Sequence, residues 1–366
     1  MEKKLRVGII GMGGFGTTEA EVVQAMPEAE FIAGVRRTPD AARKLSERFG
    51  VPIYQDWLEM LDKHEFDMVA ITATNETHRY MTEELIRRGI AVHCQKPMGI
   101  TLEDARAMRD AANRSGVYLQ IGFECRYSLL YSRPKEIIDS GEIGDVVQMY
   151  FNYSPGPWTL DGSAWKVKKS SGGLFANKLN HYVDLLRWLI GKPLTSVACT
   201  CAPKVIPYYE FTDNTFSTYR FAGGAIAHIM FNQTSTALPY GASAEECYRA
   251  GHRLEYTVVG TKGSLFVDIW HPHVRVIRSY DEDGRFYPRL ARVEDYADLP
   301  TWKLYHNVPD ETRDIVRRIL AGEQEYITPD DAYQSTLACI AADLSMERDG
   351  MPITLEEAET LDIPVS

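Results

Sequence analysis

The feature that most constrains the fold is a glycine-rich turn between an apolar segment and a helical pattern. Residues 5–10 have the composition of a buried strand, and Gly11, Gly13 and Gly16 follow with the spacing G-x-G-x-x-G. In dinucleotide-binding domains the first glycine permits a tight turn, the second admits a pyrophosphate, and the third lets the helix pack closely. The N-terminus of the next helix attracts the phosphates. We therefore expect a dinucleotide site at Gly11, Met12, Gly13, Gly14, Phe15 and Gly16.

Strand and helix patterns alternate through the first 125 residues, which predicts an α/β fold with a doubly wound parallel sheet. Helix boundaries carry recognisable signals: Thr38-Pro39 opens one helix, Gly50 ends it, and Thr101 to Asp104 resembles a capping box. Further strands are expected at 31–35, near Ile53, and at 66–73, 90–94 and 117–123.

The pattern changes near Asp145. Residues 147–153 alternate between apolar and polar, as in a half-buried antiparallel strand, and similar strands are expected at 196–201, 215–221, 225–233, 254–259 and 264–269. A long loop at 154–173 precedes a predicted helix at 174–190, and helical patterns return at 311–320 and 330–347. We expect two domains, a dinucleotide-binding domain at 1–125 and an α+β domain at 126–366.

Charge and cysteine usage narrow the class of protein. Forty basic and 51 acidic residues give a net charge of −11, which argues against nucleic acid as a partner. The first apolar run is too short for a signal peptide or a membrane span. Six cysteines without a C-x-x-C pair favour reduced thiols in a cytoplasmic protein. His271-x-His273 lacks a third ligand, so we expect no metal site.

Two segments carry candidate catalytic groups. Lys96 follows the strand at 90–94, where open parallel sheets bind their ligands, although a solvated surface lysine is the alternative. In the predicted helix, Asn177, Lys178, His181 and Asp184 are spaced to share one face. A lysine and a histidine one turn apart can transfer protons at one hydroxyl. The alternative is a solvent-facing stripe.

These motifs, taken together, resemble the glucose–fructose oxidoreductase / inositol dehydrogenase (Gfo/Idh/MocA) family along nearly the whole chain. The matching residues are Gly11-x-Gly13-x-x-Gly16, Ala73-Thr74-Asn75-x-x-His78, Lys96-Pro97, Gly122-Phe123-x-x-Arg126-Tyr127, Gly141-Glu142-Ile143-Gly144 and Gly172-Gly173 followed by His181-x-x-Asp184-Leu185-Leu186.

The resemblance implies an N-terminal dinucleotide domain and a C-terminal α+β domain whose open, mostly antiparallel sheet builds dimers or tetramers. It implies an NAD(P)-dependent oxidoreductase acting on a secondary hydroxyl of a sugar, glycoside or inositol-like polyol. Lys96 and His181 would be catalytic, and the cofactor would lie near Thr74, Asn75, His78, Gln95 and Lys96. Redox-assisted glycoside cleavage with a recycled cofactor and a non-catalytic NAD(P)-sensing regulator are the alternative functions.

Three departures from the family pattern matter. Gln95 replaces the acid of the usual Glu-Lys-Pro motif, and Asn177 stands where many members carry aspartate. An amide cannot accept a proton, so Lys178 is the third catalytic candidate beside Lys96 and His181. Finally, Arg36, Arg37 and Thr38 end the second predicted strand, where NAD enzymes usually have an acid.

Arginine at this place can hold a 2′-phosphate, which favours NADP slightly over NAD; stacking of Arg36 on adenine is the alternative. The remaining candidates would contact substrate, and four of them, Tyr153, Trp158, Trp165 and Lys166, lie in or beside the long loop. Aromatic rings there can stack on a sugar, and polar groups can bond its hydroxyls, whereas ordinary loop packing is the alternative for each. These candidates are Arg126, Tyr153, Trp158, Trp165, Lys166 and Asn177.

Overall fold

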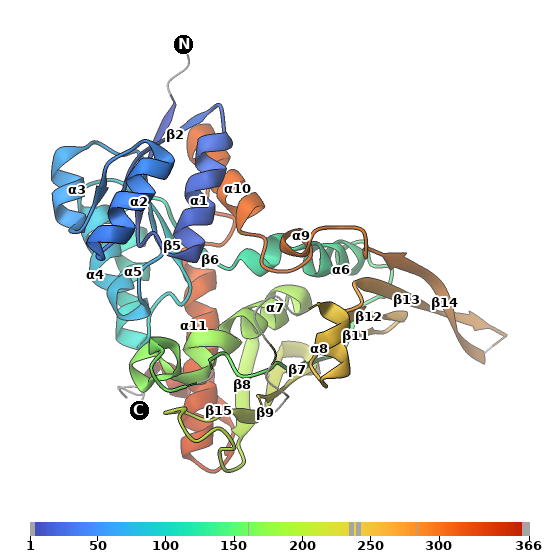
Figure 1. The fold of residues 1–366 in the computed structure, drawn as a ribbon. Coiled ribbons are helices and arrows are strands. Elements are labelled where there is room, and N and C mark those ends of the chain that lie inside the picture. The colour runs from blue at the N-terminus through green and yellow to red at the C-terminus, as the bar shows by residue number, and fades with distance from the viewer. Residues whose placement is uncertain (1–3, 160, 234–237, 239–242, 284, 361–366) are drawn as a thin grey trace. The chain divides into compact units, whose positions relative to one another are not determined.

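The computed structural model describes residues 4–159, 161–233, 238, 243–283 and 285–360 (Figure 1). Within these residues the chain forms two compact units. The first extends to Glu124 and also includes Asn307–Thr336; the second comprises Cys125–His306 and resumes at Leu337. The division differs from the expected boundary at 125 in returning residues 307–336 to the first unit. No helix in the described ranges is both long and apolar enough to cross a membrane.

The first unit contains a parallel sheet of six strands in its described residues, in the order β3-β2-β1-β4-β5-β6. This order confirms the predicted doubly wound fold. The strand order reverses between β1 and β4, and ligands of such sheets bind at the carboxyl ends beside this reversal. The strands are β1 (Leu5–Ile10), β2 (Ala29–Val35), β3 (Ile53–Tyr54), β4 (Met68–Ile71), β5 (Ala91–Gln95) and β6 (Leu119–Gly122).

The helices of the first unit begin and end at residues that supply backbone partners. The carboxylate of Asp56 accepts a hydrogen bond from the Glu59 N–H at 2.9 Å, and Thr101 accepts one from the Asp104 N–H at 3.0 Å. Gly50 ends its helix with φ +70°. The helices are α1 (Gly14–Ala25), α2 (Pro39–Phe49), α3 (Trp57–Lys63), α4 (His78–Arg87), α5 (Leu102–Ser115) and α10 (Val308–Ala321).

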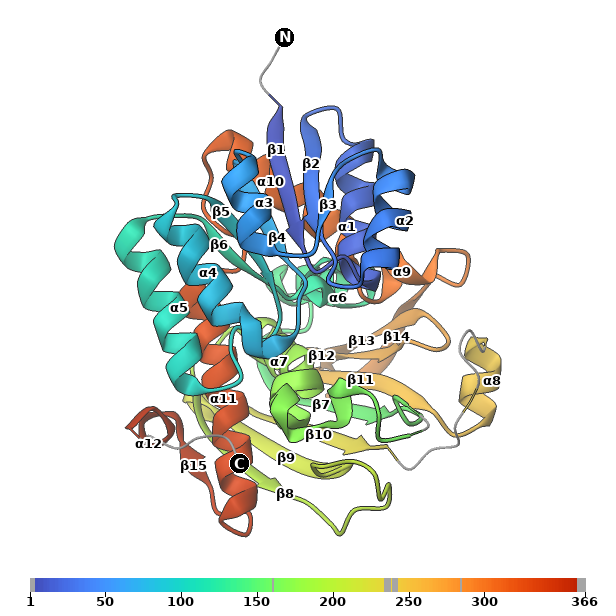
Figure 2. The same cartoon turned by 60° about the vertical axis from the view of Figure 1, so that its left-hand side comes forward.

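Apolar packing explains why a late segment of the chain belongs to this unit. Helices α1 and α2 share one core with β1 and β2, as right-handed crossovers require (Figure 2). Ile315 and Val316 of α10 are fully buried in the same core, and α10 packs along α1. Because α10 completes this core, residues 307–336 fold with the first unit.

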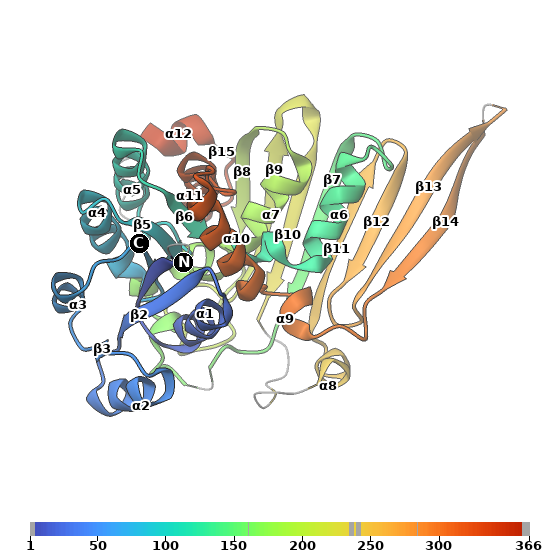
Figure 3. The same ribbon diagram turned by 90° about the horizontal axis from the view of Figure 1, so that it is seen from above.

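The second unit contains a mixed sheet whose nine described strands run in the order β14-β13-β12-β11-β7-β10-β9-β8-β15 (Figure 3). All neighbouring pairs are antiparallel except β7 and β10. The hairpins predicted at 215–233 and 254–269 are confirmed, whereas the long hairpin β13–β14 was not predicted. The strands are β7 (Val146–Ser154), β8 (Leu194–Thr200), β9 (Asn214–Phe221), β10 (Ile226–Asn232), β11 (Arg253–Gly260), β12 (Gly263–Asp268), β13 (His273–Glu282), β14 (Arg285–Asp295) and β15 (Ile353–Thr354).

Helices cover one face of this sheet. Met149, Phe151 and Tyr153 of β7 are buried on that face, whereas the intervening Tyr150 is 42% exposed. Helices α6 and α7 lie over the sheet in Figure 3, and α7 packs on β7. The remaining helices of the described chain are α6 (Leu129–Asp139), α7 (Asn180–Ile190), α8 (Ala244–Arg249), α9 (Thr301–Leu304), α11 (Pro329–Glu347), which crosses from one unit to the other, and α12 (Leu355–Thr360).

The helix predicted at 174–190 begins differently than its sequence spacing indicated. Residues Phe175–Leu179 form a π-helical turn, and only Asn180–Ile190 are α-helical. A π-turn contains an extra residue, so spacings of three and four no longer place residues 177 to 184 on one face. Asn177, His181 and Asp184 are all buried, which rules out the solvent-facing stripe for these residues.

Candidate functional site

The glycine turn between β1 and α1 leaves its backbone accessible at the middle glycine. Gly11 has φ +101°, and a Cβ there would lie 2.7 Å from the backbone of Thr72 and Ala73. A Cβ on Gly16 would lie 2.6 Å from Thr72 Oγ1. A Cβ on Gly13 would instead meet only Arg36 Nη1 at 3.6 Å and the Gly11 carbonyl oxygen at 3.9 Å. The space before Gly13 therefore fits the pyrophosphate of a dinucleotide.

Other residues expected near the cofactor occupy different environments. Within the turn, Met12 is buried and packs against Gly34, whereas Phe15 is 44% exposed. After β2, Arg36 is partly exposed, and Arg37 and Thr38 are exposed. The Arg36 guanidinium lies beside the glycine turn, because its Nη1 is 3.6 Å from the place of a Cβ on Gly13. After β4, the Thr74 hydroxyl donates to Glu76 at 2.7 Å, and Asn75 is buried.

His78 supports the turn that carries Lys96. Its buried ring lies with Nδ1 2.8 Å from the Pro97 carbonyl oxygen and Nε2 3.3 Å from the Ala73 carbonyl oxygen. Burial lowers the pKa of His78, so the ring is neutral and donates one hydrogen bond. The shorter contact identifies Pro97 as the acceptor. His78 thus fixes the segment after β5, on which the half-buried Lys96 lies.

A buried polar cluster lies against the carboxyl end of β5. The Gln95 amide donates to Glu19 Oε1 at 3.1 Å, and His93 lies between Glu19 at 3.6 Å and Glu311 at 3.5 Å. Burial raises the pKa of both carboxyl groups and lowers the pKa of His93, which favours neutral forms. Sequence reasoning missed Glu19. Its position on the apolar face of α1, together with Gly16, Ala20 and Val23, could have predicted that this carboxyl is buried.

In the second unit the π-turn places Lys178 among aromatic residues. Its Nζ lies 3.4 Å from the Tyr305 hydroxyl and 3.4 Å from His306 Nε2. The rings of Tyr153, Tyr182 and Tyr305 have their centres 5.5, 5.8 and 5.8 Å from the same nitrogen. Such rings stabilise an ammonium group by cation–π attraction.

His181 joins the same cluster through a thiol. Its Nδ1 lies 3.7 Å from Cys125 Sγ, and that sulfur lies 3.8 Å from His306 Nδ1. The two imidazole rings meet edge to face at 5.2 Å. The structure therefore brings Lys178 and His181 into one cluster. Sequence reasoning missed Cys125, Tyr305 and His306, since no local pattern links them to the helix.

Two residues that were expected to contact substrate form hydrogen bonds with other residues of the protein. Arg126 and Asp184 form a buried bidentate ion pair with N–O distances of 2.6 and 2.7 Å. This geometry favours a structural role for Arg126 over the expected contact with substrate. The Asn177 amide donates to the Lys166 carbonyl oxygen at 2.7 Å, which ties the long loop to the π-turn. Burial, with help from the charge of Lys178, lowers the pKa of Lys166.

The aromatic residues that were expected to contact substrate occupy different environments. The Trp158 ring packs 5.9 to 6.2 Å from Tyr209, Phe211 and Phe231, and its backbone N–H donates to the Tyr209 hydroxyl at 2.9 Å. This packing favours the alternative role of a loop anchor. Trp165 is 47% exposed, whereas Tyr153 is buried beneath Lys178.

Comparison with known proteins identifies the family. Residues 5–123 match the model of the oxidoreductase family with an NAD-binding Rossmann fold, Gfo/Idh/MocA, and residues 131–266 match the Gfo/Idh/MocA C-terminal domain. The chain belongs to the Gfo/Idh/MocA oxidoreductase family. It is 27% identical over 364 residues to scyllo-inositol 2-dehydrogenase (NAD(+)) of Bacillus subtilis, covering 97% of this chain and 98% of the relative.

Other relatives extend the comparison. Myo-inositol 2-dehydrogenase of Thermotoga maritima is 25% identical over 360 residues, with 96% of this chain and 99% of that protein covered. Levoglucosan dehydrogenase in complex with NADH and levoglucosan is similar in fold, with a TM-score of 0.81 and 20% identity, and 96% of this chain and all of that chain are covered.

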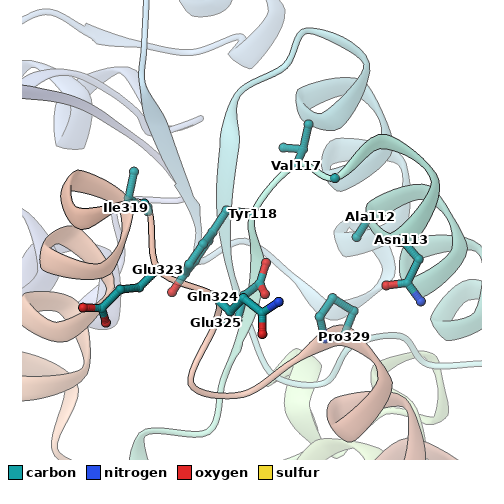
Figure 4. A pocket seen from close by; sticks show the side chains of 11 residues that line it. Ala112, Asn113, Val117, Tyr118, Ile319, Glu323, Gln324, Glu325 and Pro329 are labelled. Atoms are coloured by element: carbon teal, nitrogen blue, oxygen red, sulfur yellow. The ribbon is translucent and has the colours of Figure 1, made fainter.

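The pocket of the first unit shown in Figure 4 is not the cofactor site of a Gfo/Idh/MocA protein. It has a volume of about 460 Å³ and lies between the ends of α5 and α10, beside Tyr118 and Glu325 (Figure 4). Tyr118 precedes β6, so the pocket lies at the amino ends of the parallel strands. Dinucleotides bind at the opposite, carboxyl ends, where the glycine turn lies.

Proposed function

We propose that the protein transfers a hydride between a nicotinamide cofactor and a carbon bearing a secondary hydroxyl in a sugar, glycoside or inositol-like polyol. The observation that carries this proposal is the convergence of Lys178 and His181 in one cluster, with Cys125 and His306 in contact. Lysine and histidine together can take or return a hydroxyl proton near neutral pH. The inositol and levoglucosan dehydrogenases among the relatives support the substrate class.

The residues have separate roles in this proposal. The glycine turn and the N-terminus of α1 would hold the pyrophosphate, and the bound nicotinamide supplies the hydride chemistry. Lys96, held by the His78–Pro97 contact, Lys178 and His181 are the candidates for moving the hydroxyl proton. The contact of His181 Nδ1 with Cys125 orients the imidazole so that Nε2 would exchange the proton with substrate.

We further propose a preference for NADP over NAD. The family model describes NAD binding, so the proposed preference for NADP rests on local residues alone. Arg36 reaches the glycine turn, and a guanidinium there can pair with a 2′-phosphate. Titration of the purified protein with each cofactor, followed by intrinsic fluorescence, compares the two dissociation constants directly.

The test of the activity begins with mass spectrometry of any cofactor carried through purification, followed by a panel of sugars, glycosides and inositols. We expect Lys96→Ala and His181→Ala each to lose on the order of 10²–10⁴ in turnover. Lys168→Ala is the matched control, since this lysine pairs with Glu210 at 3.0 Å and should leave turnover unchanged. Intact cofactor binding without turnover on any substrate would instead support the regulator, and glycoside cleavage without added cofactor would support the recycling enzyme.

We also propose that the protein forms homo-oligomers through the sheet face opposite α7. Phe216 is 65% exposed there, and a depression of about 330 Å³ borders it, lined also by Tyr150, His228 and Met230. An apolar face of this kind is usually covered. Light scattering after size exclusion should give a dimer or tetramer, and Phe216→Asp should lower the mass. A monomeric wild type would refute the proposal.

A further inference from the structure

Tyr305 and His306 form a short clamp on Lys178. They follow α9, and both reach the same ammonium group at 3.4 Å. His306 has φ +61°, a left-handed conformation that non-glycine residues seldom adopt. Strained conformations persist where the surrounding structure holds them and cluster at functional sites. The positive φ of His306 therefore indicates that the surrounding structure holds the clamp in this conformation.

The partners of His306 define which nitrogen carries its proton. A lysine ammonium only donates hydrogen bonds, so His306 Nε2 must accept from Lys178 Nζ. A neutral imidazole that accepts at Nε2 carries its hydrogen on Nδ1, which lies 3.8 Å from Cys125 Sγ. His306 thus connects Lys178 to the thiol that also contacts His181 at 3.7 Å.

We propose that His306 is a positioning residue that acts through Lys178: it holds the ammonium by a hydrogen bond to Nε2 and thereby controls when Lys178 releases a proton. A role of this control in turnover rests on the proposed function, in which Lys178 is a candidate acid or base. The hydrogen bond itself does not depend on that function.

The groups around Lys178 oppose one another. The charge of Lys166 disfavours the ammonium form of Lys178, as the charge of Lys178 in turn lowers the pKa of Lys166. The rings of Tyr153, Tyr182 and Tyr305 and the acceptor nitrogen of His306 favour it. At a pH where His306 is neutral, a substitution that removes its acceptor nitrogen must lower the pKa of Lys178. At lower pH, a protonated His306 would repel the ammonium.

Two variants separate the side chain of His306 from its backbone. His306→Asn keeps a residue that tolerates positive φ but is too short to reach Lys178. His306→Gln keeps an acceptor oxygen near the position of Nε2. Protein labelled with ¹³C at lysine Cε, with Lys178 assigned from its missing signal in Lys178→Arg, reports the titration directly by NMR.

We expect the titration of Lys178 to move down by about 0.5–1 pH unit in His306→Asn, as loss of a hydrogen bond to a charged group implies. The shift in His306→Gln should be less than half as large. The acid limb of the pH profile of kcat/KM for substrate oxidation should move down together with the titration of Lys178. Lys178→Ala should abolish that limb.

An unchanged Lys178 titration in His306→Asn would overturn the inference, whether or not the protein turns over a polyol. A shift as large in His306→Gln would also overturn it, because the effect would then not come from an acceptor. The expected NMR shifts without turnover on any substrate would contradict the proposed function while leaving the hydrogen bond between His306 and Lys178 supported.

Discussion

Gln95→Glu should destabilise the protein, and the loss should grow with pH. The new carboxyl would replace an amide that donates to Glu19 at 3.1 Å, inside the cluster that also contains Glu311 and His93. Keeping it protonated costs about 1.36 kcal/mol for each pH unit above its ordinary pKa of about 4.3, hence about 4 kcal/mol at pH 7.5 and about 1.6 kcal/mol at pH 5.5. Leaving it ionised and unpaired would cost a similar amount, about 3–5 kcal/mol.

The sign follows from proton uptake. A glutamate whose pKa is raised in the folded protein binds more protons there than in the unfolded chain, so stability falls as pH rises through the window between the two pKa values. Urea unfolding at pH 5.5 and pH 7.5 measures the difference from wild type at each pH, which removes contributions common to both proteins.

Gln95→Met is the matched control. It removes the same amide donor without adding a carboxyl, so its cost of about 1–3 kcal/mol should depend on pH less than the cost of Gln95→Glu. Many members of the family carry glutamate at this position, and the expected loss reflects the carboxyl of Glu19 beside it in this chain. If Gln95→Glu matched wild type at both pH values, the account of a crowded buried cluster would be wrong.

The other predictions concern the cofactor and the proton. Gly13→Val should abolish cofactor binding in calorimetry while circular dichroism stays unchanged, because the side chain enters open space before the turn; near-normal affinity would contradict the dinucleotide site. Arg36→Asp should move the ratio of NADP to NAD affinities toward NAD by about one to two orders of magnitude, unless wild type already prefers NAD. Lys178→Ala should lose on the order of 10²–10⁴ in turnover if this lysine replaces the missing acid. Asn177→Asp should then help little, since a carboxylate would raise the lysine pKa; a gain there together with an unaffected Lys178→Ala would exclude the lysine.

The sheet of the first unit and the helices up to residue 124 could be predicted from sequence because their signals are local, whereas the membership of α10 could not. Buried parallel strands are continuous apolar runs, and their helices begin and end at readable residues such as Thr101 and Gly50. The hairpin β13–β14 was missed because it is rich in charged residues, with Arg275, Arg278 and Arg289 along it. The two strands can be recognised from their pairing with each other, and not from an apolar run in the sequence.

The candidate site was predictable only in part. Lys178 and His181 could be named from sequence because they lie close together in the chain, although the π-turn that positions Lys178 could not be predicted. Their partners Cys125 and His306 lie more than 50 and more than 120 positions away along the chain, and only tertiary structure joins them. Arg126 matched a family motif, but its ion pair with Asp184 could not be assigned from sequence.

The π-turn at Phe175–Leu179 makes this part of the protein sensitive to the number of its residues as well as to their identity. A π-turn is an α-helix with one residue inserted. Deleting Leu179 would remove the extra residue and rotate everything before it, including Lys178, by about 100° relative to α7. Lys178 would then face a different direction from His181 although both side chains remained. The number of residues in this turn, as well as their identity, therefore decides how Lys178 is oriented relative to His181.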